Sequence, residues 1–142
     1  MTRVDFYLLA GADAQARAHF ACRLADKAYR LGHRVFIHTE SAEQTRQLDD
    51  LLWTFQQNSF VPHAPCAGDT PEMPVLLGHD AEPPAAAQVL INLGPEVPLF
   101  FSRFERVAEL VDDEPRIREQ ARARYSFYKE RGYPLNTHEM KS

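Results

Sequence analysis

A strongly basic segment with aromatic residues set into it, RIREQARARYSFYKER, occupies residues 116–131. It contains six basic and only two acidic residues, which gives it a net charge of +4, whereas the whole chain has a formal net charge of −4. The basic residues are Arg116, Arg118, Arg122, Arg124, Lys129 and Arg131. The basic charge is therefore segregated from an otherwise acidic chain, and such segregation favours an acidic ligand.

If this segment is a helix, its residues separate into two faces. At about 100° per residue, Arg118, Arg122 and Lys129 share an arc of about 60° with Tyr125. The neighbouring face, which is expected to pack on the protein, consists of Ile117, Ala121 and Tyr128. A charged stripe is commonly no more than a solvated face. This arc contains no acidic residue for i,i+4 ion pairs and includes a tyrosine, which also fits an acidic peptide carrying an apolar side chain.

A second group of residues suited to binding is the aromatic run in LLWTFQQNSFVPHAP, at residues 51–65. Trp53 is expected to close a helix, and Phe55 and Phe60 follow in a polar loop. Aromatic side chains are enriched at protein interfaces because they offer large contact areas at little cost in entropy. The alternative is that these rings fold back over the edge of a sheet.

The residues that support catalysis or nucleotide binding form no recognisable motif. The loop LLAGADAQA has a single glycine and no lysine, so it lacks the close backbone approach and the cation of a phosphate-binding loop. His79 and Asp80 are adjacent, which is weak evidence for half of a metal site. Neither Cys22 nor Cys66 lies in a metal or redox motif. We therefore assign no catalytic, cofactor or metal residues, although such residues can also come together from distant positions.

The composition is that of one globular domain. The chain has 142 residues, of which 44% are hydrophobic and 25% charged, and we expect a single domain over residues 1–142. The negative net charge argues against a general nucleic-acid-binding protein. The chain has no apolar run long enough for a membrane span, no signal-peptide pattern and only two cysteines, so we expect a cytoplasmic protein.

Apolar runs and helical spacings alternate along the chain. Strands are expected at residues 4–9, 34–39, 74–79, 89–94 and 106–111. Helices are expected over residues 14–31, from Ser41 to about Trp53, and through the basic segment. Expected caps are Asp13, Ser41, Gly32 and, for the last helix, Asp112 or Asp113. Apart from its one strand, the proline-rich region 54–88 is expected to be loop. This order predicts an α/β fold with a parallel sheet.

Five stretches, in order along the chain, carry a family resemblance: FYLL, LDDLLW, SFVPH, VLINL and ARARYSFYKERGYPLNT. Together they resemble the chi subunit family of bacterial DNA polymerase III holoenzyme, nearly end to end. The resemblance implies a three-layer α/β/α Rossmann-like fold with a mostly parallel central sheet and no nucleotide-binding loop. It implies a non-catalytic accessory subunit without a cofactor. The implied partners are the psi subunit, the clamp-loader complex through psi, and the acidic C-terminal tail of single-stranded DNA-binding protein, which ends in phenylalanine.

The resemblance also implies which residues meet each partner. The positions that match the family's tail-binding site are Val111, Arg122, Tyr125 and Leu135, to which Arg118 and Lys129 are added because they share the basic arc. Ser126 occupies a position that is often lysine in relatives, so one cation is lost. The expected contact with psi consists of Trp53, Phe60, Pro62 and His63. DNA is then reached only indirectly, through these proteins.

Two other classes of function stay open. One is a small nucleotide-dependent or hydrolytic enzyme on an α/β sheet. The other is an adaptor whose basic helix contacts nucleic acid directly, and such binding would weaken steeply with salt.

Overall fold

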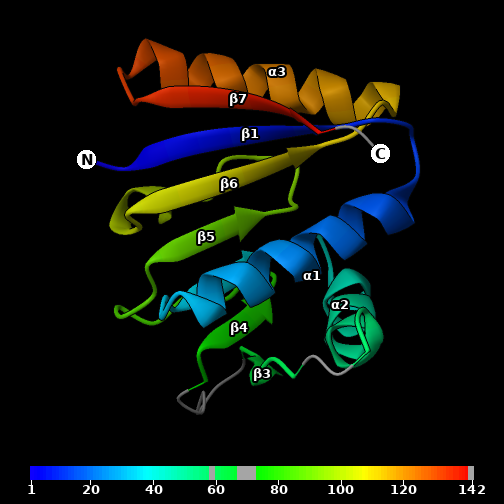
Figure 1. The fold of residues 1–142 in the computed structure, drawn as a ribbon. Helices are drawn as coiled ribbons and strands as arrows, with labels where there is room; N and C mark the ends of the chain where they lie inside the picture. Colours follow the sequence, from blue (N-terminus) through cyan, green and yellow to red (C-terminus); the bar gives the residue numbers. More distant parts are fainter. Residues whose placement is uncertain (58–59, 67–72, 141–142) are drawn as a thin grey trace.

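A sheet of seven parallel strands runs through the described part of the protein (Figure 1). The computed structural model describes residues 1–57, 60–66 and 73–140. The strands are β1 Arg3–Leu9, β2 Val35–His38, β3 His63–Pro65, β4 Val75–Gly78, β5 Val89–Asn92, β6 Arg106–Val111 and β7 Leu135–Met140. Their order is β3-β4-β2-β5-β6-β1-β7, and all six pairings between neighbours are parallel.

Helices cover both faces of this sheet, which gives the three layers of a Rossmann-like fold. They are α1 Ala14–Arg30, α2 Ala42–Thr54 and α3 Pro115–Glu130, with a short 3-10 turn at Phe101–Arg103. The helices α1 and α2 pack on one face, and α3 packs on the other (Figure 1). The predicted α/β fold is therefore confirmed. None of the helices in the described ranges has both the length and the apolar character needed to cross a membrane.

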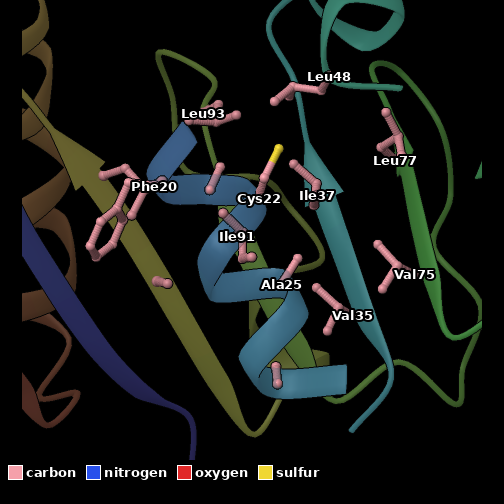
Figure 2. Packing of buried hydrophobic residues seen from close by; sticks show 14 of the residues in the cluster. Phe20, Cys22, Ala25, Val35, Ile37, Leu48, Val75, Leu77, Ile91 and Leu93 are labelled. Carbon is pink, nitrogen blue, oxygen red and sulfur yellow. The ribbon is translucent and has the colours of Figure 1, made fainter. Parts of the chain in front are cut away.

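Each face of the sheet has its own hydrophobic core. On the side of α1 and α2, the core includes Phe20, Cys22 and Leu48 from the helices and Ile37 and Ile91 from the sheet (Figure 2). Burial raises the pKa of the Cys22 thiol to about 12. The core under α3 contains Val4, Phe6, Phe36, Leu90, Ile117 and Tyr128. Because successive strand residues face opposite sides, the apolar run of β5 supplies both cores, as expected for a central parallel strand.

The caps predicted for the first two helices are confirmed. The Asp13 side chain accepts a hydrogen bond from the Gln15 amide at 2.9 Å, and Ser41 Oγ accepts one from the Gln44 amide at 3.1 Å. The reciprocal bond of the predicted capping box is displaced by one residue, because Gln44 Oε1 accepts from the amide of Glu40 at 2.8 Å.

The cap predicted for the last helix is wrong. Glu114, and neither Asp112 nor Asp113, is the N-cap of α3, and its carboxylate accepts from the Ile117 amide at 3.0 Å. Asp112 accepts from the Glu114 amide at 3.0 Å, and Asp113 accepts from the Gly11 amide at 2.8 Å. These two carboxylates are thus already hydrogen-bonded in the segment directly before α3. The bond from Gly11 to Asp113 links this segment to the loop after β1.

Two strands, β3 and β7, lie where none was expected. Among the described strands, three-residue β3, which contains Pro65, pairs with β4 alone, and β7 pairs with β1 alone. Edge strands of this kind bury few side chains, so they have no apolar pattern in the sequence. The predicted strand at 74–79 is confirmed as β4. Residues 58–59 and 67–72 of the expected loop lie outside the described residues.

Gly32 ends α1 in the left-handed region, with φ of 88°. Gly32→Ala should lower the free energy of unfolding by about 1 kcal/mol, because a Cβ atom disfavours this conformation. The cost is conformational, since nothing lies within 4 Å of the position of an added Cβ. Urea denaturation measures it, and Gly32→Asn should keep most of the stability because asparagine tolerates positive φ. Equal losses for both variants would contradict this explanation.

Candidate protein-binding surfaces

A buried polar cluster fixes the basic helix α3 on the sheet. Arg124 is 4% exposed and Glu109 is fully buried. Arg124 Nε donates to Glu109 Oε1 at 2.9 Å, and the Tyr128 hydroxyl donates to Glu109 Oε2 at 2.7 Å. Asn92 Nδ2 lies 3.1 Å from both carboxylate oxygens, and Arg124 Nη1 donates to the Pro95 carbonyl at 2.9 Å. Burial, reinforced by Glu109, raises the pKa of Tyr128.

Arg124 is thus a structural residue that the sequence reasoning missed. It belongs to the basic segment in the sequence, but in the structure its charge is paired with that of Glu109 inside the protein. Its burial could have been predicted from helical spacing. At about 100° per residue, Arg124 falls about 20° from Ile117 and about 40° from Tyr128, on the buried face. The predicted burial of Ile117 and Tyr128 is confirmed.

A shallow groove of about 220 Å³ lies between α3 and the strands beneath it. Its lining consists of Phe6, Leu8, Val111, Ala121, Thr137, Arg118, Arg122 and Tyr125. The apolar residues come from β1, β6 and α3. The structure therefore brings together four of the expected tail-binding residues, Val111, Arg118, Arg122 and Tyr125. Phe6 and Leu8 are contributions that the sequence reasoning did not include.

The polar rim of this groove has one basic residue in an ion pair and one without. Arg118 Nη1 lies 3.7 Å from Asp113 Oδ1, so a carboxylate from before the helix reaches the arc. Within the described residues, the Arg122 side chain has no ion pair or hydrogen bond. Tyr125 is 36% exposed, and its ring packs edge-on against Phe6 with centroids 5.3 Å apart. The groove thus has a fixed aromatic wall beside an available guanidinium.

Lys129 and Leu135 do not line the groove itself. Lys129 is exposed, one turn beyond Tyr125 on α3. Leu135 is half-buried and precedes Thr137 by two residues on the same face of β7. Both are therefore placed to meet a ligand that extends beyond the groove. Ser126 is exposed on α3.

The aromatic run forms an exposed patch at the other end of the sheet. Trp53 is 54% exposed and Phe60 is 63% exposed, with ring centroids 5.7 Å apart. Pro62 is half-buried beside them. The exposed interpretation therefore holds for these rings, whereas Phe55 folds back and packs on the core of α1 and α2.

His63 supports this patch from below. It is 5% exposed, and its ring centroid lies 4.6 Å from that of Trp53. Its Nδ1 and Nε2 atoms lie 2.6 and 3.1 Å from the carbonyl oxygens of Val61 and Asp49. His63 offers little surface of its own, so its contribution to a contact would be to hold Trp53 in place.

The cavity at the carboxyl ends of the strands, where nucleotides bind in many α/β sheets, does not suit a phosphate group. It has a volume of about 550 Å³. Among the described residues, its charged lining consists of Glu40, Asp50, Asp112, Glu114, Arg17 and Arg116. Burial lowers the pKa of Arg17, and Asp112 lies 3.9 Å from its guanidinium. The excess of acidic residues disfavours an anionic ligand.

The chain is similar to proteins of known family along nearly its full length. The model of the family described as DNA polymerase III chi subunit, HolC, matches residues 1–136. A Pseudomonas aeruginosa protein named DNA polymerase III subunit chi is 47% identical over 140 residues, which cover 99% of this chain and 98% of that protein. The Escherichia coli protein of the same name is 32% identical over 144 residues, covering 96% and 97%. The Haemophilus influenzae protein is 31% identical over 136 residues, covering 94% of each.

Two solved structures share the fold at low sequence identity. The crystal structure of T4 UvsW superposes with a TM-score of 0.72 at 8% identity, covering 99% of this chain and 42% of that one. Domain 2 of the DEAD-box helicase Mss116p, bound to an RNA duplex, gives a TM-score of 0.64 at 10% identity, covering 97% and 64%. At such identities the likeness shows the fold alone.

Proposed function

Because this chain belongs to the DNA polymerase III chi subunit family, we propose that it is a non-catalytic bridge between two other replication proteins. One is the psi subunit, which connects it to the clamp-loader complex. The other is single-stranded DNA-binding protein, held through its acidic C-terminal tail. The proposed psi contact is the patch of Trp53 and Phe60, and the proposed tail site is the groove under Arg122 and Tyr125.

The groove is the observation that supports tail binding most directly. It combines an apolar floor, including Phe6 and Val111, with the guanidinium of Arg122, which has no ion pair to another described residue. A peptide that ends in phenylalanine presents an aromatic ring and a carboxylate close together, and arginine recognises carboxylates through charge-assisted hydrogen bonds. The ring would occupy the floor beside Tyr125 while the carboxylate or a preceding acidic side chain meets Arg122.

The positions of the two surfaces support a bridging role. The aromatic patch belongs to α2 and the segment entering β3, at one edge of the sheet. The groove lies between α3 and the strands β6, β1 and β7, which form the other edge (Figure 1). Two partners at opposite edges can bind at the same time. We propose that it acts in the cytoplasm. We also propose that it reaches DNA only through these proteins, because its net charge of −4 disfavours direct contact with DNA phosphates.

Tail binding predicts a specific loss of affinity in two variants. Arg122→Ala should weaken binding of a synthetic peptide ending in Asp-Asp-Ile-Pro-Phe by about tenfold or more, because a hydrogen bond to a charged group contributes about 1.5–3 kcal/mol. Tyr125→Ala should have a similar effect through lost apolar contact. Isothermal titration calorimetry with the full chain measures both.

Two controls separate a formed site from a merely basic surface. Arg116→Ala should matter little, because Arg116 lies outside the groove and 4.0 Å from Glu114. A peptide without its final phenylalanine should bind more weakly, since charge alone gives a salt-screened attraction. Equal losses for Arg116→Ala and Arg122→Ala, together with a dispensable phenylalanine, would leave only nonspecific charge.

A further inference from the structure

On the side of α1, two strands at the edge of the sheet, β1 and β7, are only slightly covered by the helices of the described residues. In the described part of the chain, α1 packs over β2, β5 and β6, and α2 packs on β3 and β4. Beyond α1 lie β1 and β7 (Figure 1). Their side chains on this face include Tyr7, which is half-buried, and Asn136, His138 and Met140, which are exposed.

A groove runs along α1 beside this strip, over β1 and Met140 of β7 at one end and over β1, β5 and β6 at the other. It consists of two adjoining hollows of about 390 and 150 Å³, and Tyr7, Leu24 and Lys27 line both of them. Exposed apolar side chains mark its two ends, Met140 in the larger hollow and Leu31 in the smaller one. The groove is therefore an extended apolar surface.

The rim of this groove is basic. Arg23, Lys27 and Arg106 line it, and no Asp or Glu of the described residues does so. Arg23 lies over the Phe20 ring at 5.5 Å, and neither Arg23 nor Lys27 forms an ion pair with another described residue. Arg106 shares the buried carboxylate of Asp5 with Arg3, at 3.1 and 3.6 Å. Three cations thus line the rim, and of these only Arg106 pairs with a carboxylate of the described residues, in a chain whose net charge is −4.

The width and length of the strip match one α-helix. Two neighbouring strands span about 10 Å, which is close to the diameter of a helix with its side chains. Along α1 the groove extends from Ala16 to Leu31, or about 22 Å at 1.5 Å per residue. A helix of about four turns lying beside α1 would complete this layer of the fold.

We propose that an acidic amphipathic helix of a partner protein docks beside α1, over β1 and β7. Its apolar face would cover Tyr7 and Leu24, and its carboxylates would meet Arg23 and Lys27. A peptide fits better than single-stranded DNA, because the Tyr7 ring already stacks on His138 at 4.9 Å and lies tilted at 5.3 Å from Phe20. Bases need an open aromatic face, which this ring does not offer. This site is separate from both surfaces described above.

Two stapled helical peptides test the proposal with the full chain. They share one leucine face and carry either glutamate or lysine on the flanks. In two-dimensional NMR, the glutamate peptide should shift the amide signals of Arg23, Leu24, Lys27 and β7, and it should bind about tenfold or more tightly than the lysine peptide. Lys27→Glu should weaken binding of the glutamate peptide about tenfold. Arg46→Glu on α2, an exposed site with the same charge change, should not.

Several results would overturn the proposal. They are equal binding of the two peptides, equal losses for Lys27→Glu and Arg46→Glu, shifts confined to α3, or no shift at millimolar peptide. Competition by an oligothymidylate at the same signals would assign the groove to single-stranded DNA instead. Self-association that Lys27→Glu abolishes would assign it to a second copy of this chain. Both variants should stay folded, as expected for exposed positions, and their thermal unfolding midpoints measure this.

Discussion

Arg124→Ala should lower the free energy of unfolding by about 3–5 kcal/mol, the usual cost of removing one partner from a buried ion pair. The reason is Glu109, which is fully buried and accepts hydrogen bonds from Arg124, Tyr128 and Asn92. Without the guanidinium, its charge is left without a cation in a low-dielectric site. Denaturant unfolding followed by circular dichroism measures the loss.

The matched control for this prediction is two residues away on the same helix. Arg122→Ala removes an exposed guanidinium and should change stability by no more than about 0.5 kcal/mol. In the double variant Arg124→Ala/Glu109→Ala, the loss should be smaller than the sum of the two single losses, because the isolated charge is gone. A loss in Arg124→Ala no larger than that in Arg122→Ala would refute the structural role of Arg124.

Phe60→Ala should weaken binding of the psi subunit by about 2 kcal/mol or more, or roughly 30-fold, which is the usual size for an interface anchor. The fold should be unaffected because Phe60 is 63% exposed and its ring packs on Trp53, which is itself exposed. Calorimetry with purified psi gives the affinity, and the melting temperature gives the stability.

Leu99 provides the control for Phe60. Like Phe60, it is an exposed apolar residue, but it lies in the segment between β5 and β6, whereas the patch belongs to α2 and the segment entering β3. Leu99→Ala should therefore leave psi binding unchanged. If Phe60→Ala instead lowers the melting temperature sharply and the affinity falls with it, Phe60 is a core residue and the patch is not an anchor.

The buried parts of the fold could be predicted because burial leaves a pattern. The apolar run at Val89–Asn92 marked a central strand, and the spacing of apolar residues marked α1 and α2. The strand β7 could not be predicted, since LNTHEM is polar and only Leu135 is partly buried. Its position is set by pairing with the backbone of β1, and its own side chains do not encode that pairing.

Helical spacing predicted only the part of the candidate groove that α3 contributes, and the family resemblance added Val111. The spacing of Arg118, Arg122 and Tyr125 placed them on one face of a helix, and the structure places all three around the groove. The floor includes Phe6 and Leu8, which are far away in sequence and belong there only because β1 lies next to β6. Helical periodicity carries no information about such a long-range neighbour.

The position of β1 also has a consequence for the order in which the protein forms during synthesis. Val4 pairs with Val107 on one side and with Leu135 on the other. While the ribosome is still making α1, β2 and α2, the first strand therefore has neither of its neighbours. Closing loops of this length costs entropy before any contact is gained, so β2, β4 and β5 can pair first. The nascent strand would stay unpaired until β6 emerges, and its outer edge would stay open until β7 follows α3, so it would be open to chaperones during that time.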